Sequence, residues 1–187
     1  MRVAVSSVIF GLVLAAPAAA TTFLPVTFDD LVKRADVIFV GEVTDVRPFV
    51  MQSGADTVVM TRVAFSVVDP LFGTSSLVEV FDFLGGQVGD AGMRVAGMPQ
   101  FTAGDRHVVF ARREQSINPI VGFTQGLLRV TRDSAGVDRV QTLDRRPLER
   151  IENIGRVASV SAASAAPMRL ADLRDRIVTG LRQAGRR

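Results

Sequence analysis

Residues 37–46, with the sequence VIFVGEVTDV, decide the fold class that we expect for this 187-residue chain. Most of this run is β-branched or aromatic, and such side chains pack well on the pleated surface of a sheet. Pro48 is expected to end the pairing of this strand, and residues 53–56 are predicted to form a turn. We therefore predict that the run forms a β-strand.

Similar runs follow along the chain and are separated by Gly, Pro, Asp and Ser. The predicted strands after the first are 57–68, 77–84, 106–111, 119–131 and 137–143. No helix of 10–15 residues lies between them, as parallel strands would require. Both faces of 77–84 carry apolar side chains, which favours a curved sheet. The sequence thus predicts a mainly β fold with minor α content: a small antiparallel, OB-like barrel with a short N-terminal helix and a C-terminal helix.

Helix signals stand at the two ends of these strands. Thr27 is a good N-cap, and Asp29 and Asp30 would lie in the first helical turn, where the helix dipole favours negative charge. Residues 168–187 are predicted to form an amphipathic helix with one apolar stripe, made of Leu170, Leu173, Ile177 and Leu181. This stripe fits packing on the domain, and it also fits contact with a membrane surface or a docking partner.

The first twenty residues are typical of a secretory signal peptide. Arg2 precedes an uncharged, mostly apolar run over 3–16, and 18–20 form a small-residue Ala-Ala-Ala site. The apolar run is shorter than the roughly 20 residues of a membrane-spanning helix. We expect cleavage after Ala20, no stable membrane span after cleavage, and an exported protein that is periplasmic or extracellular.

The remaining chain divides into three parts by composition. We predict a β-barrel domain over 21–145, an Ala- and Ser-containing linker over 146–167 and the helix over 168–187. The chain has no cysteine, so its hydrophobic core has to hold the domain without disulfides. Thiol chemistry, cysteine-based zinc sites and cysteine-linked haem are excluded, and we expect no cofactor.

Charge and aromatic content argue against two common classes of partner. The formal net charge is +3, but residues 168–187 hold six Arg and two Asp, so the basicity belongs to the tail. Trp and Tyr are absent, and the aromatic residues are twelve Phe. Sugar-binding grooves and single-strand nucleic-acid platforms rely on Trp or Tyr. We therefore expect neither carbohydrate nor nucleic acid as a partner.

No catalytic set is recognisable along the chain. His107 is the only histidine, so a multi-histidine metal site is excluded, and no G-x-S-x-G motif occurs. Glu79 and Asp82 have opposite parity in their predicted strand and would face different sides. We expect no catalytic residue and no metal site. A hydrolase with a dispersed carboxylate pair stays open as an alternative, because such a pair can be distant in sequence.

Four short motifs carry a resemblance to a known group. They are Gly85-Gly86, MRVAGMPQF at 93–101, Gly104-Asp105 and VGFTQG at 121–126. Read in this order, the chain resembles exported bacterial proteins of unassigned activity with the pattern Gly-Gly…Met-x-Val-x-Gly-x-Pro-x-Phe…Val-Gly-x-x-Gln-Gly. The resemblance covers roughly residues 27–132 and implies nothing about activity.

A weaker similarity concerns residues 31–46, which look like the opening of netrin-like domains and of tissue inhibitors of metalloproteinases. Those domains are OB-fold barrels, so the similarity implies a barrel. Those inhibitors present an N-terminal cysteine to the protease zinc and carry disulfides, and this cysteine-free chain has neither. Modulation or inhibition of an exported metalloprotease is therefore an alternative function.

The leading hypothesis is an exported, non-enzymatic β-barrel module that binds a protein or peptide, with another exported protein, such as a protease, as its partner. Met-rich loops framed by Gly can repack around partners. Residues 85–92 are predicted to be a flexible loop or hairpin tip. The apolar residues Met93, Met98 and Phe101 equally fit a purely structural role in closing one end of the barrel. The candidate partner-binding residues are Gly85, Gly86, Met93, Met98, Phe101 and Gln125.

Overall fold

The computed structural model describes residues 24–54, 56–114, 117–155 and 166–186. The predicted signal peptide, its cleavage site at Ala20 and most of the Ala- and Ser-containing part of the predicted linker lie outside the described residues. Among the described residues, no helix is both long and apolar enough to cross a membrane.

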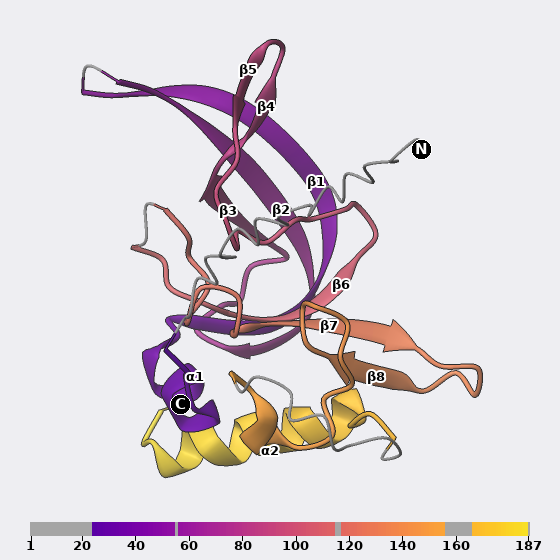
Figure 1. Ribbon diagram of the computed structural model, residues 1–187. Coiled ribbons are helices and arrows are strands. Elements are labelled where there is room, and N and C mark those ends of the chain that lie inside the picture. Colours follow the sequence, from indigo (N-terminus) through magenta and orange to yellow (C-terminus); the bar gives the residue numbers. More distant parts are fainter. Residues whose placement is uncertain (1–23, 55, 115–116, 156–165, 187) are drawn as a thin grey trace, which may run out of the picture.

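The prediction of a mainly β fold is confirmed. Six strands form one antiparallel sheet in the order β3-β2-β1-β6-β7-β8, and β4 and β5 form a separate hairpin. Figure 1 shows α1 and α2 at one end of the molecule and the β4–β5 hairpin at the other, beside the long arm of β1 and β2. In chain order the elements are α1 (Phe28–Arg34), β1 (Val37–Ser53), β2 (Asp56–Phe72), β3 (Val78–Leu84), β4 (Gly86–Val88), β5 (Ala91–Met93), β6 (Arg106–Ala111), β7 (Leu127–Arg132), β8 (Asp138–Gln141), the 3-10 turn η1 (Ile151–Asn153) and α2 (Leu170–Gln183).

β1 begins where the sequence predicts but continues well beyond Val46. Its pairing with β2 runs to Ser53 and includes Pro48, which lies opposite Thr61. β6 pairs with β1 only as far as Glu42, so Pro48 lies where β1 has a strand neighbour on one side only. Proline is tolerated at such edge positions because its missing N–H is not needed by a second neighbour. Three register shifts along the β1–β2 pair bend it into the curved arm of Figure 1.

Alternate side chains of β1 enter two separate hydrophobic cores. Ile38 and Val40 pack in the first core with Leu173 and Ile177 of α2. Phe39 and its neighbours of the same parity pack in the second core, whose further members include Phe65, Phe81, Phe83 and Met98. The first part of β1, residues 37–41, is buried on both faces, which fits its near-continuous apolar sequence.

The short N-terminal helix is capped as predicted. The Thr27 hydroxyl accepts a hydrogen bond from the Asp30 backbone N–H at 3.1 Å, and the Asp30 carboxylate in turn bonds Thr27, which completes a capping box. The hydrogen bonds from Thr27 hold the pKa of Asp30 below its ordinary value. This cap fixes the entry of the chain into the first core, where α1 buries Leu31 and Val32.

The C-terminal helix packs on the domain. Leu173, Ile177 and Leu181 are buried in the first core, so the apolar stripe faces the protein interior. Beyond the helix, the Arg186 guanidinium donates to the backbone carbonyls of Val32 and Lys33 at 2.6 and 2.9 Å. Because the stripe is buried, contact with a membrane through it would require α2 to leave the first core.

The predicted closed, OB-like barrel is not confirmed, because the six-stranded sheet is open between β3 and β8. The outer edge of β8 is occupied by later parts of the chain. The Val140 N–H donates to the Met168 carbonyl at 3.0 Å, and the Leu148 N–H donates to the Val140 carbonyl at 3.1 Å. These segments take the hydrogen-bonding positions that a closing strand would need. Leu148 and Ile154, in the predicted linker, are buried in the first core and therefore belong to the domain.

The strand predicted over 119–131 is correct only in its second half. Residues 121–126 form turns, and β7 begins at Leu127. Gly122 and Phe123 have φ values of 67° and 70°, which a strand does not allow. The Gly126 N–H donates back to the Val121 carbonyl at 2.9 Å and closes the turn.

Candidate binding cavity

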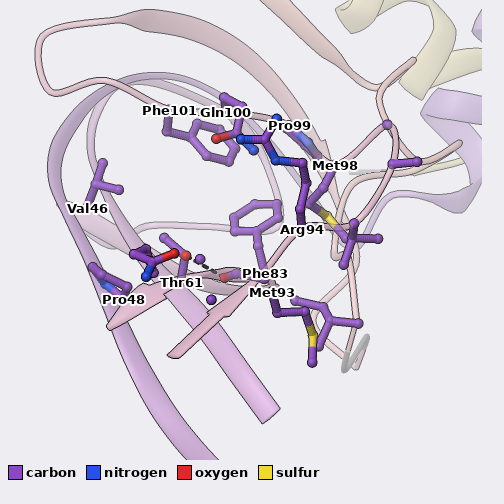
Figure 2. Close-up of a pocket in the computed structure, with 18 residues that line it drawn as sticks. Val46, Pro48, Thr61, Phe83, Met93, Arg94, Met98, Pro99, Gln100 and Phe101 are labelled. Atoms are coloured by element: carbon purple, nitrogen blue, oxygen red, sulfur yellow. Dashed lines mark hydrogen bonds between the residues drawn. The ribbon is translucent and has the colours of Figure 1, made fainter. Parts of the chain in front are cut away.

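A cavity of about 890 Å³ lies between the β1–β2 arm and the segment 83–101. This volume is within the range of small-molecule and cofactor sites, which run from about 300 to 1,000 Å³. Most of the lining residues belong to the continuous segment 83–101, whereas Val46, Pro48 and Thr61 belong to β1 and β2. Figure 2 shows Val46 and Pro48 on one side, Arg94 and Met98 on the other, and the rings of Phe83 and Phe101 between them.

Gly85 and Gly86 attach the start of the loop to the arm. The Gly85 N–H donates to the Val59 carbonyl at 2.7 Å, and the Thr61 hydroxyl donates to the Gly85 carbonyl at 2.6 Å. Both glycines have positive φ, and a Cβ on Gly86 would lie 2.5 Å from Thr61 Oγ1 and 3.2 Å from Pro48 Cβ. Only glycine allows this close approach, so the pair shapes one wall of the cavity with its backbone.

The opposite wall is a tight turn within the Met- and Gly-containing motif. The Met98 N–H donates to the Val95 carbonyl at 3.2 Å, and Gly97 adopts a φ of 76° at this turn. Met98 is 9% exposed and joins the second core, whereas Gln100 remains exposed. The turn therefore anchors one side chain in the core while its backbone borders the cavity.

Aromatic rings form the floor of the cavity. The ring centroids of Phe83 and Phe101 are 4.7 Å apart, and those of Phe65 and Phe101 are 5.7 Å apart in an edge-to-face arrangement. Phe101 also contacts the ring of His107 at 6.0 Å. Such aromatic pairs add about 0.5–1.5 kcal/mol each beyond the contribution of their buried area, so they stabilise this floor.

The polar groups at the cavity are few. Arg94 is the only charged side chain among the lining residues, and Thr61, Gln87 and Gln100 provide a hydroxyl and two amides. The lining includes no carboxylate, histidine or cysteine side chain. Across the described part of the chain, His, Asp and Glu side chains form no group of three that could hold a metal ion.

Five of the six predicted binding residues line this cavity, and Gln125 does not. Its side-chain oxygen accepts from the Val26 N–H at 2.7 Å, and its amide nitrogen donates to the carbonyls of Leu24 and Gly122 at 3.0 and 3.2 Å. Gln125 therefore ties the segment before α1 to the turn before β7. The motif VGFTQG thus has a structural explanation in this fold.

His107 lies behind the floor, on the same face of β6 as the second core. It is fully buried, and neither ring nitrogen has a hydrogen-bond partner among the described residues. Burial, reinforced by the charge of Arg129 and opposed by that of Asp105, lowers the pKa of His107 from 6.5 to about 4. The imidazole is therefore neutral at physiological pH.

Glu79 and Asp82 face different sides of β3, as their parity predicts. Glu79 is 4% exposed and receives two hydrogen bonds from Arg113, each 3.0 Å long. Asp82 is held by Arg62 through two bonds of 2.8 Å. Each carboxylate already has an arginine partner, and neither lines the cavity.

Sequence reasoning missed the part of the cavity that the arm contributes. Val46, Pro48 and Thr61 are distant in sequence from the loop, and Pro48 reads as a strand end. Phe83 is recognisable from sequence as a core residue, and Arg94 only as a member of the motif at 93–101. Comparison with known proteins found no matching family model, no matching curated protein and no matching solved structure.

Proposed function

We propose that this protein is an exported, non-enzymatic module that binds an extended segment of a partner protein in the cavity beside the β1–β2 arm. The observation that carries the proposal is the composition of the cavity wall. Residues 83–101 provide an aromatic floor, a methionine-containing turn and most of the polar side chains, and Val46, Pro48 and Thr61 of the distant β1–β2 arm line the same cavity. This combination of an apolar surface and few polar groups is typical of recognition sites.

The chemistry of the lining supports binding rather than catalysis. The lining lacks the carboxylates, imidazole and thiol that serve as general acids, general bases or strong nucleophiles. Its one hydroxyl, on Thr61, donates to the Gly85 carbonyl at 2.6 Å. A peptide would instead find aromatic faces for its apolar side chains and amides for its backbone.

Selection from a random heptapeptide library displayed on phage tests this proposal. The exposed Gln100 lines the cavity, so Gln100→Trp would fill space there without removing a core contact. The exposed Thr179 of α2 is not a lining residue, so Thr179→Trp is the matched control. We expect the wild type and Thr179→Trp to enrich the same peptides and Gln100→Trp to lose them.

Two results would contradict the proposal. One is a wild type that enriches no peptide above an empty support. The other is a folded Gln100→Trp variant that retains the wild-type peptides, because binding would then lie outside the cavity. Circular dichroism of each variant establishes that the mainly β fold is kept.

A further inference from the structure

Arg94 is a charge without a partner at an otherwise uncharged site. No other residue that lines the cavity is charged, and within the described parts of the chain no hydrogen bond or ion pair is formed by the Arg94 side chain. Asp45, whose neighbour Val46 lines the cavity, is already paired with Arg47 at 3.1 Å. The positive charge of Arg94 is therefore uncompensated in this part of the structure.

The apolar floor lies beside this charge. Phe83 is 2% exposed and packs against Phe101 with 4.7 Å between ring centroids. Figure 2 places both rings between Arg94 and the opposite side of the cavity at Val46. A ligand bound over these rings would therefore also lie close to the Arg94 guanidinium.

From this arrangement, and resting on the proposed function, we infer that the cavity selects peptide segments in which an aspartate or glutamate stands within two residues of a large apolar residue. The carboxylate binds Arg94, and the apolar side chain packs on the partly exposed ring of Phe101, which the buried ring of Phe83 supports from within. In an extended peptide, residues two apart point to the same side and are about 7 Å apart, so one such pair can present a carboxylate and an apolar side chain to the same wall.

The side chain at position 94 suits a carboxylate in particular. A guanidinium can form two parallel hydrogen bonds with a carboxylate, which adds direction to the charge attraction. A nucleic-acid backbone would require several basic contacts along its length, whereas this cavity offers one. A peptide with one acidic side chain satisfies the site with no charge left over.

Charge reversal in the same peptide selection tests this inference. We would compare the wild type, Arg94→Gln and Arg94→Glu. Arg112→Glu is the matched control, because Arg112 is also exposed and does not line the cavity. Each random peptide is displayed within a longer chain and has no free C-terminal carboxylate. Any acidic preference therefore has to come from Asp or Glu side chains.

We expect the wild type and Arg112→Glu to enrich Asp or Glu near a large apolar residue by up to about fivefold over the unselected library. Arg94→Gln should lose the acidic preference and keep the apolar one. Arg94→Glu should replace the acidic preference with a preference for Lys or Arg, since the sign of the charge in the cavity is reversed.

The failures of the two proposals are distinguishable. If wild type and Arg94→Glu enrich the same peptides, the inference about Arg94 is wrong while peptide binding in the cavity stands. If wild type enriches apolar peptides with no acidic preference, the inference is also wrong. If no peptide is enriched by the wild type, both the proposed function and this inference are overturned.

Discussion

The replacement of His107 by leucine should remove the part of the pH dependence of folding stability that comes from this buried imidazole. The buried imidazole has a pKa of about 4 in the folded state and about 6.5 in the unfolded chain. Between these two values the unfolded state binds a proton that the folded state does not. The contribution of His107 to folding is therefore fully present above pH 6.5 and is lost as the pH falls to about 4.

The magnitude follows from the size of the pKa difference. Each unit is worth about 1.4 kcal/mol, so the loss in the free energy of unfolding is about 3 kcal/mol between pH 6.5 and pH 4. At pH 7.5 the His107→Leu variant should be within about 1 kcal/mol of the wild type. The two ring nitrogens have no partners to lose in the described structure, and leucine fills a similar volume.

Urea unfolding at pH 7.5 and pH 4.5 measures this effect. His107 is the only histidine, so changes that arise from the carboxylates are shared by both proteins and cancel in the comparison. We expect the wild type to lose about 2.5 kcal/mol more than the variant between these two pH values. Equal losses in the two proteins would refute the reasoning, because the folded-state pKa would then be near its ordinary value.

Three further predictions concern the elements that hold the cavity and the first core, each checked by urea unfolding at pH 7.5. Gly86→Ala should cost about 1–3 kcal/mol and weaken peptide selection, because Gly86 has a φ of 139° and a Cβ there would meet Thr61; an unchanged stability would contradict this. Thr27→Ala should cost about 1 kcal/mol by removing the capping box of α1, and Thr27→Ser should restore most of it. Ile177→Ala should cost about 2–5 kcal/mol, because Ile177 is fully buried in the first core; a cost below 1 kcal/mol would mean that α2 is not docked in solution.

The sequence predicts the strands well where β-branched residues alternate or run together. It fails at the turn 121–126, where Gly122 and Phe123 adopt positive φ values that a strand does not allow. It also fails to show that β1 passes through Pro48, because tolerance of proline depends on which side of the strand has a neighbour. The neighbours of a strand are set by the tertiary fold and cannot be read from the local sequence.

The openness of the sheet is likewise decided by distant segments. Nothing in the sequence of β8 shows that Met168 will occupy its outer edge, yet this contact separates an open sheet from a barrel. In the candidate site, Gly85, Gly86 and the motif at 93–101 stand out because their glycines frame a loop. The contribution of Thr61 depends on the bends of the β1–β2 arm, which no local pattern predicts.

The most direct measurement of the central claim is an NMR titration of the ¹⁵N-labelled protein with the peptide that the wild type enriches most. Bound peptide changes the chemical shifts of the amides that it contacts. We predict that the largest changes fall in residues 85–101 and in the part of β1 and β2 around Val46 and Thr61. Changes concentrated on α2 or on the outer face of β3, with residues 85–101 unaffected, would contradict the account.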